Sequence, residues 1–261
     1  MKVNSLHYLC PLKFEICMNL IVDIGNSSIK VALFEADQLR WNERVDYALV
    51  SELQRIASDF EIEACAWSSV GQRDTQIDET LHKLFPYVLE INGTTPTPLV
   101  CDYETPSTLG ADRLAAAVGA FASQPNVPLL IIDAGTCITY DYVSAEGHYL
   151  GGNISPGLGI RLRALHDQTA RLPLVSSEGE LPLIGTHTHA AIRAGVVWGM
   201  EYEIEGYIRA FQQQHADARI FLTGGNGHRF AQTLPVERND LLVETGLNQI
   251  LLYNLRQTPQ G

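Results

Sequence analysis

Two stretches of the sequence place an acidic residue, a glycine and polar side chains at the end of an apolar run. The first stretch is LIVDIGNSSIK at 20–30, and the second is LLIIDAGTCITYDYV at 129–143. When Asp23 is aligned with Asp133, the glycines of both stretches coincide and a polar residue follows each of them. An internal repeat of domain length predicts two related domains.

The residues of each stretch are suited to holding phosphate. An ionised carboxylate is costly to bury, so an acid at the end of a buried strand faces solvent, a donor or a cation. A glycine two residues later lets backbone N–H groups approach a ligand closely. Asn26, Ser27 and Ser28 add donors, and Lys30 can place a positive charge near transferred phosphates. The first stretch therefore predicts a phosphate cradle with a metal-facing acid.

A simpler interpretation is that both stretches are ordinary hairpin turns. Asp, Gly and Asn favour turns for backbone reasons alone, so one copy by itself decides nothing. Two copies at equivalent places favour a pair of facing hairpins that clamp a triphosphate and its cation between domains. Other nucleotide sites are excluded, because the sequence has no G-x-x-x-x-G-K-[ST] and no G-x-G-x-x-G opening a helix.

The composition limits the class of protein. The chain has 261 residues, 46% of them hydrophobic and 18% charged, as in a globular protein with a large core. A formal charge of −12 argues against nucleic-acid binding. No apolar stretch reaches the ~18 residues that span a bilayer, so no membrane association is expected. The five scattered cysteines include no C-x-x-C pair and predict reduced thiols in the cytoplasm.

The first half of the chain predicts mixed α and β structure. Residues 1–17 do not form a signal peptide, and we expect the domain to begin at Met18, after a dispensable extension or an upstream start. Residues 19–35 predict an antiparallel hairpin. Helices are expected at 51–59 and 75–85, capped by Ser51 and Thr75, and strands at 64–69 and 87–91. A further helix is expected at 110–122, and SQPNVP at 123–128 is a natural boundary.

The second half predicts a related order of elements. After the second hairpin, GGNISPG at 151–157 reads as a glycine-rich turn before a helix. Residues 187–214 predict one long or broken helix, and 219–230 a strand, a glycine turn and a helix. The last helix is expected at 246–256.

Several motifs together resemble a known family. The two Asp-x-Gly hairpins resemble the phosphate motifs of the actin-like, acetate-and-sugar-kinase superfamily, and within it the chain resembles the type III pantothenate kinases. The matching motifs, in the order in which the family has them, are DIGNSSIK at 23–30, GADR at 110–113, DAGT at 133–136, GGNISPG at 151–157, LP at 172–173, THAAIRAG at 188–195 and LTGGNG at 222–227.

The resemblance implies a fold and an activity. The fold would be α/β, with two ribonuclease-H-like domains at 18–124 and 125–261 and a nucleotide cleft between them. The activity would be ATP-dependent phosphorylation of the pantothenate 4'-hydroxyl, the first step of coenzyme A synthesis. Magnesium would accompany ATP, and the protein would be a homodimer.

The resemblance also implies a role for each matching residue. Asp112 would accept the proton of the hydroxyl, Asp133 would bind potassium or ammonium, and Thr188 would reach the substrate site of a partner subunit. The remaining ATP contacts would be Asp23, Ile24, Gly25, Asn26, Ser27, Ser28, Ile29, Lys30 and Thr136. The remaining pantothenate contacts would be Tyr103, Gly110, Ala111 and Arg113.

Residue chemistry leaves some of these roles open. Asp112 stands at a predicted helix start beside Arg113, whose charge would favour the ionised carboxylate, but such a pair is often only a cap and a surface ion pair. Arg113 could bind the carboxylate of pantothenate or simply hold Asp112. His187 and His189 suggest metal only weakly.

Two other functions remain as alternatives. One is a non-catalytic regulatory homologue that binds nucleotide, and the other is a kinase that acts on a different small alcohol.

Overall fold

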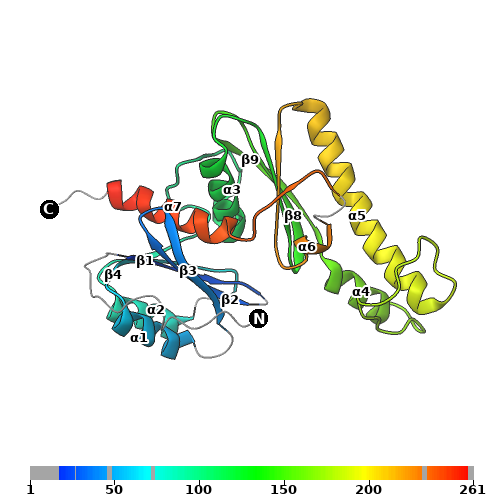
Figure 1. The fold of residues 1–261 in the computed structure, drawn as a ribbon, viewed down its shortest axis with the longest axis horizontal. Coiled ribbons are helices and arrows are strands. Elements are labelled where there is room, and N and C mark those ends of the chain that lie inside the picture. The colour runs from blue at the N-terminus through cyan, green and yellow to red at the C-terminus, as the bar shows by residue number, and fades with distance from the viewer. Residues whose placement is uncertain (1–17, 27, 46–48, 72–73, 231–233, 258–261) are drawn as a thin grey trace.

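A computed structural model of the chain describes residues 18–26, 28–45, 49–71, 74–230 and 234–257. These residues form two β-sheets, one mostly from each half of the sequence, with two helices packed between them (Figure 1). The predicted extension at 1–17 and the phosphate contact Ser27 lie outside the described residues.

The first sheet has five strands in the order β3-β2-β1-β4-β5. β1 and β2 form the predicted antiparallel hairpin, in which Asp23 pairs with Lys30. β3 continues the sheet antiparallel to β2, whereas β4 and β5 are parallel to β1 and β4 respectively. The strands are β1 (Met18–Ile24), β2 (Ile29–Glu35), β3 (Gln38–Val45), β4 (Ile62–Ser69) and β5 (Val88–Glu90).

The second sheet repeats this topology and adds one strand. Its order is β11-β10-β7-β8-β9-β6, so β9-β8-β7-β10-β11 corresponds to the whole first sheet, with the same parallel and antiparallel pairs. The predicted internal repeat is therefore confirmed. The strands are β6 (Val100–Cys101), β7 (Leu129–Ala134), β8 (Cys137–Val143), β9 (His148–Pro156), β10 (Arg219–Thr223) and β11 (Glu237–Arg238).

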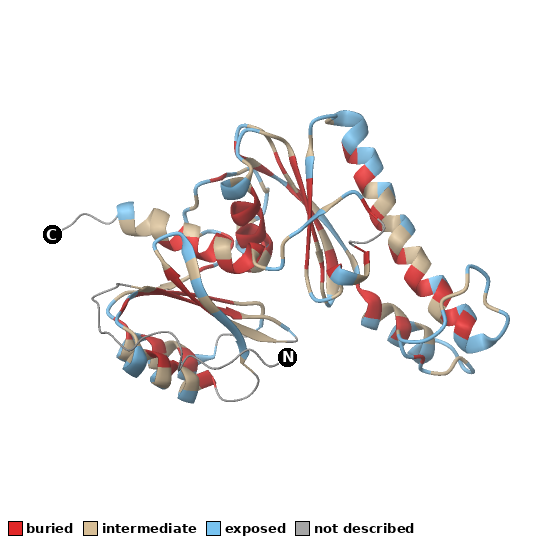
Figure 2. Cartoon of the chain, viewed as in Figure 1, coloured by how far each residue is buried: buried red, intermediate tan, exposed pale blue. Residues whose placement is uncertain are grey.

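Helices cover both sheets and form a shared layer between them. Figure 2 shows buried residues along α3, along α7 and through the strands that these helices cover. Apolar side chains of α1 and α2 cover the outer face of the first sheet, and those of α4 and α5 cover the outer face of the second. The helices are α1 (Leu49–Asp59), α2 (Thr75–Leu84), α3 (Ala111–Ser123), α4 (Leu158–Asp167), α5 (Thr188–Gln214), α6 (Gly227–Phe230) and α7 (Leu242–Gln257), with a 3₁₀ turn η2 (Pro106–Thr108).

Helices α3 and α7 cross at backbone contact. A Cβ atom built on Gly246 would lie 1.7 Å from the carbonyl oxygen of Ala115, and one on Gly119 would lie 2.2 Å from the oxygen of Leu242. The two glycines therefore allow the helix backbones to meet with no side chain between them. This contact joins α3 and α7 into one layer, and both sheets pack against that layer.

Two elements pack with the sheet of the other half of the chain, across the predicted domain boundary. β6 comes from the first half of the chain but pairs with β9 of the second sheet. α7 comes from the second half but packs on α3 and on strands of the first sheet. The division between 18–124 and 125–261 stays a prediction.

Three local predictions were wrong. Thr75 is the first helical residue of α2, and Asp74 is the cap, because its carboxylate accepts hydrogen bonds from the N–H groups of Gln76 and Ile77. Ser51 lies inside α1, which begins at Leu49. α7 begins four residues before the predicted position, at Leu242.

The glycines of GGNISPG do not form a turn. Gly151 and Gly152 belong to strand β9, and the helix α4 begins only after Gly157. A Cβ atom on Gly152 would lie 2.0 Å from the carbonyl oxygen of Tyr140 on the neighbouring strand, so this position has no room for a side chain. Close approach of the backbone explains glycine here better than a turn does.

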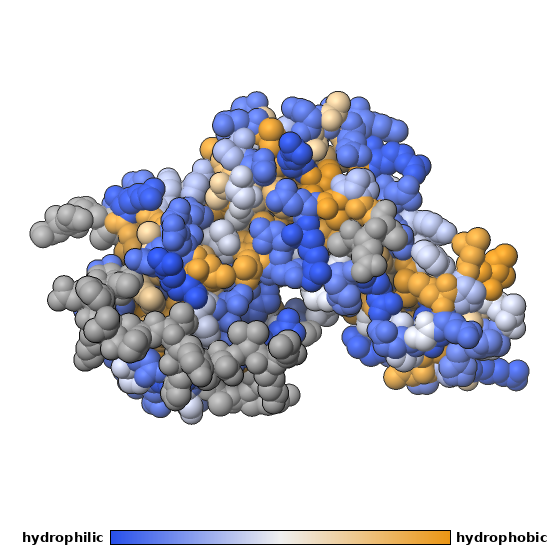
Figure 3. All heavy atoms as spheres, in the orientation of Figure 1, coloured by the Kyte–Doolittle hydropathy of each residue, from blue (hydrophilic) through white to orange (hydrophobic). Residues whose placement is uncertain are grey.

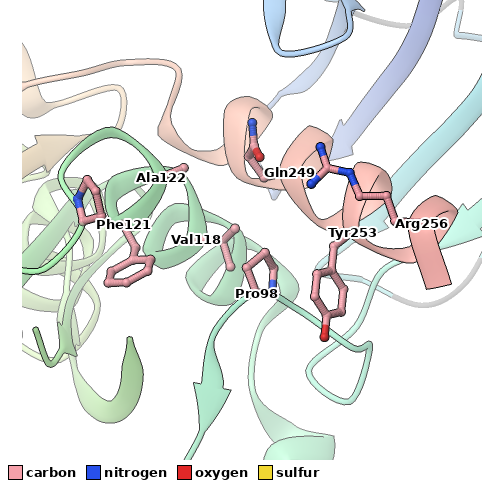
Figure 4. A pocket seen from close by; sticks show the side chains of 8 residues that line it. Pro98, Val118, Phe121, Ala122, Gln249, Tyr253 and Arg256 are labelled. Atoms are coloured by element: carbon pink, nitrogen blue, oxygen red, sulfur yellow. The ribbon is translucent and has the colours of Figure 1, made fainter. Parts of the chain in front are cut away.

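The far ends of α3 and α7 leave an apolar cavity of about 330 Å³ (Figure 4). It lies toward the C-terminal ends of both helices, whereas the predicted proton acceptor Asp112 is in the first turn of α3. The cavity therefore does not belong to the predicted site. Its lining consists of Pro98, Val118, Phe121, Ala122, Pro125, Gln249, Tyr253 and Arg256.

The crossing of α3 and α7 gives a prediction about stability. We expect Gly246→Ala to lower the free energy of unfolding by about 1 to 3 kcal/mol, because the new methyl group overlaps backbone that cannot rotate away. The matched control is Gly206→Ala in the exposed face of α5, where nothing lies within 4 Å, and it should stabilise the protein by about 0.5 to 1 kcal/mol. Urea unfolding measures both changes. Equal effects of the two substitutions would contradict the tight crossing.

Candidate active site

The first hairpin ends in a buried carboxylate. Asp23 is 7% exposed and lies at the end of β1, where its Oδ1 accepts a hydrogen bond of 3.0 Å from the Ser68 hydroxyl. Burial and the negative charge of Glu244 raise the pKa of Asp23 to about 6, while Lys30 and Ser68 oppose that rise. The turn that follows closes through a hydrogen bond from the Gly25 N–H to the Ser28 carbonyl oxygen, so Asn26 lies within a bend that Ile24 and Ile29 flank.

A lysine on the second strand of this hairpin faces the same space. Lys30 pairs with Asp23 across the strands, and its Nζ lies 2.8 Å from the carboxylate of Glu244 in the first turn of α7. On the next strand, Arg44 pairs with Lys30 and is exposed. Cross-strand partners share one face of a sheet, so Asp23, Lys30 and Arg44 form a charged row.

The second hairpin presents its own acid in the same way. Asp133 lies at the end of β7 and is half-buried. The backbone of Gly224, with φ +88°, passes so close that a Cβ atom there would lie 2.2 Å from Asp133 Oδ1. Burial and the charge of Asp112 raise the pKa of Asp133 to about 7, and Lys30 opposes that rise.

Neighbouring loops hold the bend at Gly135 and Thr136 in place. The Asn226 side chain donates to the Gly135 carbonyl oxygen at 3.2 Å, and the Asn226 N–H donates to Ala134 at 2.9 Å. From the other side, the Gly157 N–H donates to the Thr136 carbonyl oxygen at 3.1 Å. The glycine motifs at 151–157 and 222–227 therefore both support this bend.

The acids of the two hairpins converge on one space. The charge of Asp23 contributes to the raised pKa of Asp133, and the charge of Asp112 contributes to the raised pKa of both carboxyls. Lys30 acts on both acids in the opposite sense. Such effects require these groups to be near one another, since Coulomb interactions fall with distance and are screened by water. In Figure 3 the surface is indented between the two sheets, with hydrophilic residues around the indentation.

Of the two roles that the sequence left open for Arg113, its side chain does not take the one of holding Asp112. Asp112 is the second residue of α3, and its Oδ1 accepts a hydrogen bond of 2.8 Å from the backbone N–H of Arg113. Gly110 is the cap residue and Ala111 opens the helix, so both place Asp112 in the first helical turn. A carboxylate at this position is favoured by the helix dipole.

The Arg113 side chain instead forms a buried ion pair with Asp141. Its Nε and Nη2 lie 2.9 and 2.7 Å from Asp141 Oδ1, which also accepts a hydrogen bond of 2.6 Å from the Tyr149 hydroxyl. Burial opposes the charge on the guanidinium, yet Asp141 holds the pKa of Arg113 above its ordinary value. The Tyr103 ring lies over this pair, with its centroid 5.9 Å from Arg113 Cζ. Tyr103 and Arg113 are thereby brought together.

Thr188 lies apart from these groups. It is the exposed first residue of α5, whose N-terminal end lies beside α4 at the far side of the second sheet (Figure 1). His187 caps this helix, because its Nδ1 accepts a hydrogen bond from the Ala190 N–H. Among the described residues, no group of three His, Cys, Asp or Glu side chains is arranged to hold a metal ion.

Sequence reasoning missed three charged residues of the site. Glu244 was missed because the last helix was predicted to begin after it. Asp141 follows Thr139 by two residues in a strand, so alternation could have placed it on the face of Asp133. No local sequence signal marks Arg44, because it joins the charged row only through the pairing of β2 with β3.

Comparison with known proteins identifies the family. A family profile described as Type III pantothenate kinase matches residues 19–210. A Type III pantothenate kinase of Bacteroides fragilis (strain ATCC 25285) is 44% identical over 239 residues, which cover 91% of this chain and 98% of the relative. A Type III pantothenate kinase of Cytophaga hutchinsonii is 38% identical over 240 residues, covering 91% of this chain and 100% of the relative.

Solved structures share the fold at low sequence identity. A putative Baf family transcriptional activator from Campylobacter jejuni is similar with a TM-score of 0.57 and 22% identity, covering 91% of this chain and 99% of that one. A putative N-acetylmannosamine kinase from Listeria monocytogenes is similar with a TM-score of 0.51 and 12% identity, covering 92% and 99%. These likenesses concern the fold alone and confirm the predicted two-domain α/β fold.

The duplicated sheets, the two acidic hairpins and the similarity along nearly the whole chain lead to the same conclusion. No helix among the described residues has the length and apolar character needed to cross a membrane. The chain belongs to the type III pantothenate kinase family and phosphorylates pantothenate with ATP in the synthesis of coenzyme A.

Proposed function

We propose that the triphosphate of ATP binds between the two hairpins and that Asp112 accepts the proton of the pantothenate 4'-hydroxyl. The observation that carries this proposal is the position of Asp112, which acts electrostatically on both Asp23 and Asp133 from the first turn of α3. Because its charge reaches the acids of both hairpins, Asp112 is where the acceptor hydroxyl would meet the γ-phosphate.

The transfer step needs alignment and neutralisation of charge more than covalent help from the protein. The 4'-oxygen forms a bond to the γ-phosphorus while the bond from that phosphorus to the β,γ-bridging oxygen breaks, which leaves ADP. The hydroxyl proton passes to Asp112. Residues 23–30 and Thr136 would contact the nucleotide, and Lys30 would exchange part of its interaction with Glu244 for the phosphates.

The acceptor side would be formed by Tyr103, Gly110, Ala111 and Arg113. Because Asp141 already neutralises Arg113, the guanidinium would contact pantothenate through N–H groups that the ion pair leaves over. Tyr103 would support the same part of the substrate, since its ring lies over Arg113.

A monovalent cation fits the surroundings of Asp133. Burial and neighbouring acids raise the pKa of this carboxyl to about 7, so a bound cation would relieve a real excess of negative charge. Potassium and ammonium are the candidates, and Asp133 would hold either one. When bound, the ion supplies positive charge beside the phosphates. Magnesium would arrive with ATP, as is usual for kinases.

A homodimer is part of the proposal. Thr188 is exposed and lies apart from Asp112 within one chain, as expected of a residue that completes the site of a partner subunit. Just before it, Leu183 and Ile184 are 73% and 78% exposed, which is unusual for large aliphatic side chains and suits an interface. We place the enzyme in the cytoplasm, where the described cysteines Cys65, Cys101 and Cys137 would stay free thiols.

A non-catalytic regulatory homologue is the alternative, and the comparisons do not favour it. The curated relatives reported above are named as kinases. A regulator would need the hairpins to bind nucleotide but would have no use for an acid at the position of Asp112.

One assay tests the activity and its cation requirement together. Purified protein with ATP, magnesium, potassium and pantothenate should form phosphopantothenate, measured by mass. Replacing potassium with sodium should lower the rate, and Asp133→Asn should make the remaining rate insensitive to potassium. A potassium response that survives in Asp133→Asn would contradict the assignment of the ion to this residue.

Asp112→Asn tests the proton acceptor. We expect kcat to fall by about 10² to 10⁴-fold, because the amide cannot accept the proton, while the shape of the helix start is kept. Binding of ATP, measured by titration calorimetry, should remain. An Asp112→Asn enzyme with wild-type kcat would remove Asp112 from this role.

The raised pKa of Asp23 gives a prediction about pH and stability without ligands. The folded carboxyl has a pKa of about 6 against 3.8 in the unfolded chain, so its ionisation destabilises the fold as pH rises from about 4, with the full effect above about 6. Asp23→Asn should therefore raise the free energy of unfolding by about 1 to 3 kcal/mol at pH 8 and have little effect at pH 4.

Urea unfolding at both pH values measures the effect of Asp23→Asn. The matched control is Asp217→Asn, which makes the same change of charge at an exposed position. If Asp23→Asn destabilised the protein equally at both pH values, the raised pKa would be wrong.

A further inference from the structure

One large aliphatic side chain is exposed on the second sheet, in the same row as Asp133. Ile154 of strand β9 is 63% exposed. It pairs with Thr139 of β8, which in turn pairs with Asp133 of β7. Residues paired directly across strands project from the same face of a sheet, so Ile154 projects from the face that carries Asp133.

The two rows that precede it along the sheet show where this face is covered. Leu129 and Val143 pair with one another and are buried in the core that includes α3. In the next row along the strands, Asp141 pairs with Gly152 and is covered by Arg113 from the start of α3. The row of Ile154 comes after that, beyond the start of the helix. Ile154 therefore lies one row farther along the sheet than the carboxylate covered by Arg113, the residue that follows Asp112.

The duplicated first sheet has a different chemistry in the equivalent row. There the row consists of Asp23, Lys30 and Arg44, whereas in the second sheet it consists of Asp133, Thr139 and Ile154. Both rows begin with an acid, but one continues with two cations and the other with a hydroxyl and an aliphatic group. The first row suits the anionic nucleotide, and the second suits an uncharged, partly apolar part of a substrate.

We infer that Ile154 is the apolar wall of the acceptor site and contacts the two methyl groups of pantothenate. This inference rests on the proposed function. The 4'-hydroxyl of pantothenate is attached to a carbon beside a quaternary carbon that bears both methyl groups, so whatever holds the hydroxyl at Asp112 holds those methyl groups close by. An exposed isoleucine on the adjoining strand gives them an apolar surface. The side chain is a specificity-determining residue and takes no part in proton transfer.

The experiment compares two substrates in three proteins. The substrates are pantothenate and the analogue in which both methyl groups are replaced by hydrogen. The proteins are the wild type, Ile154→Ala, and the matched control Leu150→Ala, which removes a 54% exposed leucine from the same strand. Steady-state kinetics give KM for each substrate and for ATP, and size-exclusion chromatography gives the oligomeric state.

We expect the wild type to prefer pantothenate to the analogue by about 10 to 200-fold in kcat/KM, the usual discrimination for small apolar groups. In Ile154→Ala this preference should shrink by about 10-fold through a higher KM for pantothenate, with KM for ATP unchanged. Leu150→Ala should keep the wild-type preference.

Three results would overturn the inference while leaving the proposed function intact. They are an unchanged preference in Ile154→Ala, an equal loss for both substrates, and a change of oligomeric state, which would mean that Ile154 packs against a second copy. Failure of the proposed function would appear separately, as a wild-type protein that phosphorylates neither substrate.

Discussion

The close crossing of α3 and α7 is the contact on which the arrangement of the site depends. Gly119 and Gly246 let the two backbones touch, so the first turns of both helices reach the space between the sheets. Asp112 and Glu244 then both act on Asp23. Because each helix lies on a different sheet, this crossing also sets how the two hairpins face one another. The arrangement of the candidate active site therefore depends on the tight crossing of these two helices.

The charges in this space are unbalanced in the absence of ligands. Burial and repulsion bring the pKa values of Asp23 and Asp133 to about 6 and about 7, and Lys30 offsets only part of this. Arg113 adds no free positive charge, because Asp141 already neutralises it. A cation bound beside the carboxylates of Asp23 and Asp133 would offset their negative charge. Phosphoryl transfer brings such a cation, because magnesium accompanies the nucleotide. Ionisation of these carboxyls therefore destabilises the fold at the position where bound ligands would offset the charge.

The two sheets are copies in topology but differ in the chemistry of one row. Duplication alone would give two equivalent acidic bends. The difference comes from the second and third strands of each copy. These strands carry Lys30 and Arg44 in the first sheet, and Thr139 and Ile154 in the second. The bends themselves also differ in support, since glycine-containing loops at 157 and 224 enclose the second one. One fold thereby offers different surfaces to the anionic nucleotide and to the partly apolar end of the acceptor.

The sequence by itself determined the repeat, the hairpins, most strands and helices, and the motifs that mark the family, because strand alternation, helix spacing and turn residues are local signals. It did not determine the partner of Arg113, since Asp112 is its neighbour in the chain while Asp141 is its neighbour in space. It also misread the glycines at 151–152, which serve close strand packing and not a turn. Only the tertiary structure decided that Glu244, Arg44 and Ile154 join the site, because pairing of strands and crossing of helices bring together residues that no local pattern connects.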